Sequence, residues 1–283
     1  HLAKPDVSEE DAGAYRWATK FGAWVLIAGS ALTFYTGDAQ AKAITQLQPS
    51  KIAAAEGAFE DTGDFSLLTI PNADQTGTIV EIKIPLVLSF IAGVPQIKGI
   101  DTIREQYAEH GYSLQNGSQT NIQGEYAQQL AEKYGHIDPI PNVNATYWSF
   151  RMMMAFGGLG LLIGVYVLWV IRGGRTPKAS KLWTTLMAAM PLLPLFGISF
   201  GWIFTEMGRQ PWLVAGVMPT QAGISPTVSA GEVLLSLIVY TLLYGLLAVI
   251  EVGLFFHYTA KGLPKVAEPK VSEDPDAPMS FAY

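Results

Sequence analysis

Long apolar stretches separated by charged loops organise this sequence. A membrane-spanning helix needs about 20 mostly apolar residues, because the hydrocarbon core is about 30 Å thick and each helical residue rises about 1.5 Å. Four stretches approach or exceed that length, and the first is the least apolar of them. The predicted spans are Trp17 to Tyr35, Tyr147 to Ile171, Leu182 to Thr205, and about Val233 to Tyr258. We therefore expect an all-α membrane protein built as a transmembrane helix bundle of four spans, with a long outward-facing loop domain.

The charges of one short loop predict the orientation of this bundle. Four basic residues and no acidic one lie between the second and third spans: Arg172, Arg175, Lys178 and Lys181. Short loops rich in Lys and Arg remain in the cytoplasm. By alternation, both chain ends are expected to be cytoplasmic. The segment 36–146, with thirteen acidic and six basic residues, is expected to face outward.

The predicted organisation has four parts. They are a cytoplasmic lead-in with the first transmembrane helix at 1–35, an outward-facing loop domain at 36–146, three transmembrane helices at 147–258, and a disordered cytoplasmic tail at 259–283. Within the loop domain, the stretch from Ile84 to Ile97 is too short and too interrupted by Pro and Gly to cross a bilayer. We expect it to pack on the outer membrane face or on the helices.

Composition narrows the chemistry that the chain can perform. Hydrophobic residues make up 49% and charged residues 15% of the sequence, whereas soluble domains carry about 25% charged residues. Cysteine is absent, which excludes disulfides, thiolate metal sites and iron–sulfur clusters. No nucleic-acid-binding signature is present. Because the chain begins at His1 without a Met, we expect it to be a fragment that lacks upstream sequence.

Arg151, near the outer end of the second span, is followed directly by three methionines, Met152 to Met154. An arginine there can simply extend its charge to the interface, and methionines often fill irregular packing gaps. A methionine thioether is also a soft ligand for haem iron, and a neighbouring arginine can offset haem propionates. Helical spacing places Arg151 and Met153 about 200° apart, so one porphyrin would have to engage them from different sides.

Glu206 and Arg209 lie three residues apart at the outer end of the third span, so we expect them to pair on one helix face. The pair can be a structural helix-end ion pair or part of a functional site. The run GRQPW, residues 208–212, follows directly and should end the helix at Pro211.

Other ionisable residues are more ambiguous. Lys51 and Glu56 lie on a short Ala-rich helical stretch, either as solvated charges or as donor and acceptor for a quinol. Glu232 fits a capping box that begins with Ser229. Glu251, deep in the last span, can serve a proton path or a helix contact. The histidines lie in loops or near helix ends and are not expected to be axial ligands: His1, His110, His136 and His257.

Three motifs, in their order along the chain, resemble subunit I of the cytochrome bd-type quinol oxidases. They are KIAAAE at 51–56, FRMMM at 150–154 and GRQPW at 208–212. The resemblance covers nearly the whole chain, as the C-terminal portion of that subunit with the shorter type of quinol loop. It implies three cofactors: a low-spin haem b, a high-spin haem b and haem d.

The resemblance also implies roles for individual residues. Lys51 and Glu56 match the quinol-binding loop. Met153 matches the axial methionine of the low-spin haem iron, and Arg151 matches the arginine beside that haem. Glu206, as the catalytic carboxylate, with Trp202 and Arg209, matches the surroundings of the high-spin haem b and haem d. The histidine ligands and the haem d glutamate of the family are expected upstream of His1.

The function implied is that of a terminal respiratory oxidase in a prokaryotic plasma membrane, which oxidises ubiquinol or menaquinol, reduces dioxygen to water and contributes to a proton gradient. The implied partners are a second membrane subunit, subunit II, and small single-helix subunits. Two alternatives remain open at this point. One is a multi-span transporter or proton channel that uses Glu206, Arg209 and Glu251, and the other is a membrane scaffold whose outer loop binds a partner.

Overall fold

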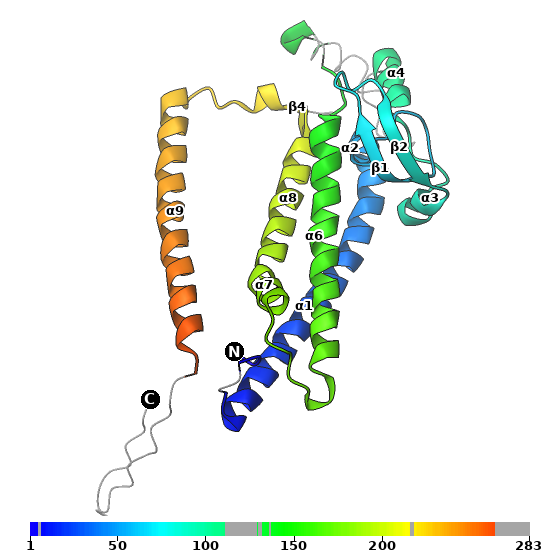
Figure 1. Ribbon diagram of the computed structural model, residues 1–283. Coiled ribbons are helices and arrows are strands. Elements are labelled where there is room, and N and C mark those ends of the chain that lie inside the picture. The colour runs from blue at the N-terminus through cyan, green and yellow to red at the C-terminus, as the bar shows by residue number, and fades with distance from the viewer. Residues whose placement is uncertain (5–6, 111–128, 130–131, 136, 216–217, 264–283) are drawn as a thin grey trace, which may run out of the picture. The chain divides into compact units, whose positions relative to one another are not determined.

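The computed structural model describes residues 1–4, 7–110, 129, 132–135, 137–215 and 218–263, and these residues are mainly helical (Figure 1). The chain divides into two compact units. One comprises Tyr15–Ser225 with Leu2, and the other comprises His1, Ala3–Ala14 and Pro226–Tyr283. Residues 259–261 of the predicted disordered tail 259–283 are helical, and the tail after residue 263 lies outside the described residues, as do the side chains of His110 and His136.

Two described helices are long and apolar enough to cross a membrane, α6 (Val143–Val170) and α9 (Ala230–Lys261). Each is preceded by a capping residue, whose side chain accepts a hydrogen bond from a backbone N–H group of the first turn that would otherwise be unpaired. At α6 the Asn142 side chain accepts a hydrogen bond from the Ala145 amide at 2.9 Å. At α9, Ser229 and Glu232 form the capping box that the sequence predicts.

The third predicted span is not one straight helix. It consists of α7 (Lys181–Ala189) and α8 (Leu192–Arg209), which meet at a bend of 40°. Pro191 and Pro194 flank the start of α8, and proline both lacks an N–H donor and clashes with the preceding turn. The two helices together count as a third candidate span only if the bent pair is one crossing.

Helix α1 (Glu9–Leu47) contains the first predicted span, but it is not among the helices apolar enough to qualify. A fourth span therefore stays a prediction. The helix nevertheless packs closely on α6, because a Cβ at Gly164 would lie 3.3 Å from side-chain atoms of both Leu26 and Ile27. Small residues at such crossings let membrane helices approach each other, and Ala23 of α1 is buried there.

Segment 36–146 continues from α1 into α2 (Pro49–Glu56), which is followed by strands β1 (Phe65–Pro71) and β2 (Thr78–Ile84). The strands form an antiparallel hairpin in which Phe65 pairs with Ile84 and Pro71 with Thr78. The prediction of an all-α protein missed this hairpin. The sequence of β2, TIVEIKI, alternates β-branched with polar residues, as is typical of strands. The remaining elements are α3 (Val87–Ala92), α4 (Ile100–His110), η1 (Arg172–Gly174), β3 (Trp212–Val214), β4 (Met218–Pro219) and η2 (Thr220–Gly223).

The core of this segment is built around α2. Ala53 and Ala54 have no exposed surface and pack with Phe59, Ile100 and Val143 of the neighbouring elements. On another side, Leu88 and Ala92 of α3 pack with Ile52 of α2, a helix of the same segment, so the expected placement of Ile84 to Ile97 on the membrane face or the membrane helices stays a prediction. Helix α2 thereby contacts α6 and α8 as well as β1 of the hairpin, and Figure 1 shows it between α6 and β1.

Candidate functional site

Helix α2 carries Lys51 and Glu56, and both are buried, each with 6% of its surface exposed. The interpretation of these residues as solvated charges is therefore wrong. Pro49 lies in the first turn, and Gly57 ends the helix in the left-handed region at φ 62°. A Cβ at Gly57 would approach Thr69 to 3.0 Å, so glycine permits both the turn and the contact with β1.

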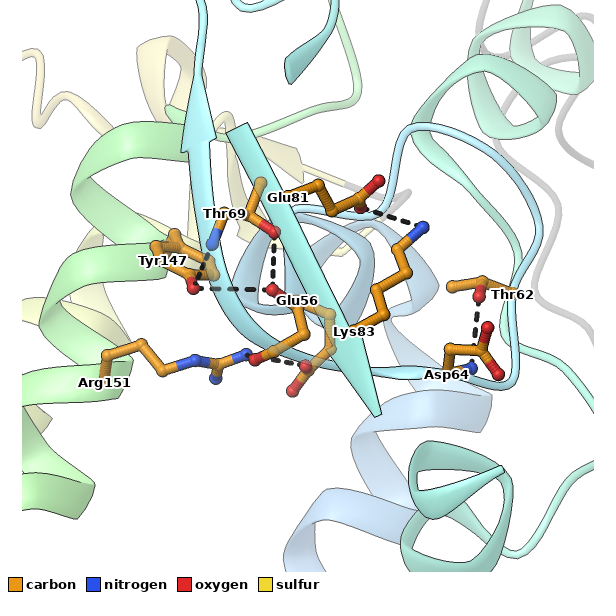
Figure 2. Close-up of polar contacts among 9 residues, drawn as sticks. Glu56, Thr62, Asp64, Thr69, Glu81, Lys83, Tyr147 and Arg151 are labelled. Carbon is orange, nitrogen blue, oxygen red and sulfur yellow. Dashed lines mark hydrogen bonds and ion pairs between the residues drawn. The ribbon is translucent and has the colours of Figure 1, made fainter. Parts of the chain in front are cut away.

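Glu56 forms an ion pair with Arg151 of α6 (Figure 2). One carboxylate oxygen, Oε2, accepts a hydrogen bond from Arg151 Nη2 at 2.7 Å, and only 7% and 12% of the two side chains are exposed. Burial raises the pKa of Glu56, while the charge and hydrogen bond of Arg151 oppose that rise. The sequence suggested roles for both residues but not their contact.

The guanidinium of Arg151 is held in a largely aromatic setting. Its Cζ lies over the rings of Phe65, Tyr147 and Phe150 at 4.9, 4.7 and 5.3 Å. Nη2 also donates to the Ser66 carbonyl at 2.7 Å. Nε and Nη1 are buried and have no hydrogen-bond partner among the described residues. These two donors can serve a further acceptor, such as a carboxylate.

Tyr147, one helical turn before Arg151, is a part of the site that the sequence analysis missed. It has no exposed surface, and its hydroxyl accepts a hydrogen bond from the Thr69 amide at 2.7 Å. Ser66 hydrogen-bonds Thr69 side chain to side chain and lies 3.4 Å from the Tyr147 hydroxyl. Figure 2 shows this cluster beside the ion pair. The sequence could have indicated Tyr147, because it lies four positions before Arg151 and residues at that spacing share one helix face.

Met153 lies on a different side of α6 and faces α8. A Cβ at Gly201 would lie 3.0 Å from the Met153 sulfur. The two helices also meet through ring contacts, with Phe150 and Phe204 centroids 4.8 Å apart. The thioether thus fills the space beside this glycine in a contact between α6 and α8, and its role as a ligand stays a prediction.

Glu206 and Arg209 form the expected ion pair, at the C-terminal end of α8. Arg209 Nε is buried and has no hydrogen-bond partner among the described residues. Trp202, from the same helix, is 67% exposed. Glu251 and His257 are exposed on α9, and the described residues contain no group of three or more His, Cys, Asp or Glu side chains that could hold a metal ion.

Lys51 lies against the end of α8. Its ammonium donates to the Thr205 carbonyl at 3.4 Å and lies 4.7 Å from the centroid of the Phe204 ring. Burial lowers the pKa of Lys51, the charge of Arg209 lowers it further, and Glu206 partly compensates. Two groups of the residues suggested by the sequence therefore meet at α2: Glu56 with Arg151, and Lys51 with the end of α8. Met153, which lies against Gly201, belongs to neither group.

Comparison with known proteins shows which family the chain resembles. A family model described as cytochrome bd terminal oxidase subunit I matches residues 1–263. The chain is 34% identical over 236 residues to cytochrome bd ubiquinol oxidase subunit 1 of Bacillus subtilis (strain 168), which covers 80% of this chain and 45% of the relative. It is 29% identical over 270 residues to cytochrome bd-II ubiquinol oxidase subunit 1 of Escherichia coli (strain K12), covering 81% of this chain and 52% of the relative.

The fold is similar to that of a solved structure, the bd oxidase from Geobacillus thermodenitrificans. The TM-score is 0.59 at 22% identity, and the match covers 88% of this chain and 55% of the other. The chain spans about half the length of the curated relatives that it matches. The family expected from KIAAAE, FRMMM and GRQPW is confirmed: the chain belongs to the cytochrome bd terminal oxidase subunit I family.

Proposed function

We propose that this chain forms part of the haem-bearing subunit of a terminal respiratory oxidase in a bacterial plasma membrane. The oxidase oxidises ubiquinol or menaquinol, reduces dioxygen to water and contributes to a proton gradient. Family membership supports this over the transporter and scaffold alternatives. The observation that carries the proposal is the buried Glu56–Arg151 ion pair, because it connects the helix of the proposed quinol site to the helix of Met153.

The quinol site in this proposal lies at α2, with Glu56 and Lys51 as its polar residues. A quinol must lose two protons as it is oxidised, so a proton acceptor at the site assists the reaction. Burial raises the pKa of Glu56, which brings this carboxylate closer to the pKa of an efficient base at neutral pH. The positive charge of Arg151 stabilises the ionised form of the buried Glu56 side chain, so that this carboxylate can accept a proton.

The described residues fit the low-spin haem b that the family implies. Arg151 has two buried donors without a partner among the described residues, and these suit a propionate. Met153 belongs to the FRMMM motif, which matches the family's axial methionine, and its sulfur lies against Gly201 of α8. We assign Met153 as the iron ligand and Arg151 as the charge that offsets the propionates. When bound, the haems supply the electron transfer and the dioxygen chemistry.

The second haem pair, high-spin haem b and haem d, is assigned to the outer end of α8. Arg209 has a buried Nε without a partner among the described residues, which suits an anionic group. Glu206 holds Arg209 by an ion pair and supplies a carboxylate close to it. Trp202 presents an exposed ring on the same helix. A second membrane subunit and small single-helix subunits complete the proposed assembly, with both chain ends cytoplasmic and 36–146 outside.

Substitutions in α2 test this function in the intact oxidase complex. Lys51→Ala or Glu56→Ala is expected to slow quinol oxidation, while oxygen consumption driven by an artificial electron donor continues. Ser50→Ala is a matched control on the same helix, because its buried hydroxyl has no hydrogen-bond partner among the described residues. Equal loss with both electron donors would argue against a quinol site at α2, and a colourless complex would argue against an oxidase.

A further inference from the structure

Gly208, the first residue of the GRQPW motif, lies where three helices meet. A Cβ at this position would lie 3.0 Å from Cε and 3.1 Å from Cγ of Lys51, and 3.3 Å from Cγ2 of Thr146. The first two atoms belong to α2 and the third to α6, while Gly208 itself is in α8. The missing side chain of Gly208 therefore provides the space in which the Lys51 side chain lies.

This space directs the Lys51 side chain to the end of α8. There its ammonium donates to the Thr205 carbonyl, in the last turns of the helix, and lies over the ring of Phe204. A cation near the C-terminal end of a helix is favoured by the partial negative charge of the helix dipole at that end. Gln48, just before α2, donates to the Gly208 carbonyl at 3.4 Å, so the start of α2 is tied to α8 twice.

The other end of α2 carries Glu56, whose position is set by Arg151 of α6. Helix α2 is only 8 residues long and buried along its length, so a displacement at Lys51 moves Glu56 as well. Gly208 also lies two helical turns after Gly201, the residue that faces the Met153 sulfur. The same face of α8 thus receives Lys51 and Met153 in two successive glycine gaps.

We propose that Lys51 is a positioning residue whose side chain, admitted by the gap at Gly208, fixes α2 against α8 and thereby places Glu56 in the quinol site. This inference rests on the proposed function and gives Lys51 a role different from direct contact with quinol. The lowered pKa of Lys51 accords with its buried position. The KIAAAE and GRQPW motifs then form the two halves of one contact.

A double-substitution cycle in the intact oxidase complex tests the proposal. The variants are Gly208→Ala, Lys51→Ala and their combination. The measurements are the KM for a water-soluble ubiquinol analogue, the oxygen consumption with an artificial electron donor, and the haem absorbance. Gly197→Ala is the matched control on α8, because the nearest atoms to its added Cβ lie 3.9 Å away, an ordinary contact.

Gly208→Ala is expected to raise the quinol KM about threefold to tenfold, the range for a disturbed contacting pair. Lys51→Ala should give a similar rise. The combination should be no worse than Lys51→Ala alone, because removal of the lysine side chain opens the space that the alanine needs. Donor-driven oxygen consumption and haem absorbance should stay close to those of the unsubstituted complex, and Gly197→Ala should change nothing.

The outcomes separate the inference from the proposed function. If the two effects multiply, or if Gly208→Ala has no effect while Lys51→Ala does, the positioning role is overturned and the quinol site stands. If no variant alters the quinol KM, both the inference and the quinol site at α2 are overturned. If Gly208→Ala prevents assembly, Lys51→Ala must restore it in the combination, and failure to do so counts against the inference.

Discussion

Arg151 and Glu56 form a buried ion pair across 95 residues of sequence, joining a membrane helix to the short helix α2 that precedes the hairpin. A charge pair enclosed in this way is costly to break, because removal of one partner leaves the other charge buried and uncompensated. Arg151 also holds the Ser66 carbonyl of β1 with the same nitrogen. A single guanidinium thus joins α6, α2 and β1.

The first prediction concerns the pH dependence of quinol oxidation in an Arg151→Gln variant. Burial raises the pKa of Glu56 and Arg151 lowers it, so loss of the positive charge should raise the pKa further. Glu56 must be ionised to accept a proton, and a higher pKa keeps it protonated to higher pH. The acid limb of the profile of kcat/KM against pH should therefore move to higher pH. An acid limb that stays in place or moves to lower pH would contradict this role of Arg151.

The second prediction concerns the hydroxyl of Tyr147. Tyr147→Phe leaves the buried Thr69 amide without its acceptor, and an unsatisfied buried donor costs about 1–3 kcal/mol. Hydrogen exchange at the amides of β1 should become faster, and the quinol KM should rise because Ser66 then holds Arg151 less firmly. Tyr166→Phe, on the same helix but half exposed, is the control. Unchanged exchange in β1 would show that the hydrogen bond does not hold the strand.

The third prediction concerns the crossing of α1 and α6. Gly164→Val would press side-chain atoms into Leu26 and Ile27, where even a single Cβ would lie at 3.3 Å. Overpacking of this kind costs about 1–3 kcal/mol, so the yield of assembled complex and its thermal unfolding temperature should fall. Gly158→Val is the control, because a Cβ at Gly158 meets no atom within 4 Å. Equal losses for the two variants would contradict a specific contact between α1 and α6.

The sequence predicts the elements that depend on local patterns. The apolar runs of α6 and α9, the capping box at Ser229 and the pairing of Glu206 with Arg209 follow from periodicity and spacing, and all are observed. The expected third span is bent near Pro191 and Pro194, because proline lacks the N–H donor that would continue the helix. The apolar character of that segment follows from its sequence, but the length of the apolar run does not reveal the 40° bend.

Contacts between distant residues were the part that the sequence could not supply. Nothing near Glu56 indicates a partner on α6, and nothing near Gly208 indicates that Lys51 occupies the space beside it. Both depend on the route of the chain through segment 36–146 and back into the membrane helices. The hairpin was missed for a related reason, since a strand of seven residues gives a weak signal beside long apolar helices.

The last prediction concerns Met153, whose sulfur can serve either to pack against α8 or to ligate haem iron. Met153→Leu conserves volume, so packing against Gly201 should survive at a cost below about 1.5 kcal/mol. A leucine side chain cannot ligate iron, however, so the low-spin haem band in reduced-minus-oxidised spectra of the complex should disappear or shift. Met152→Leu, the adjacent residue of the same run, is the control and should leave the band unchanged. A Met153→Leu complex with an unaltered band and normal stability would leave packing as the explanation for the whole methionine run, because the substitution separates the chemistry of sulfur from its volume.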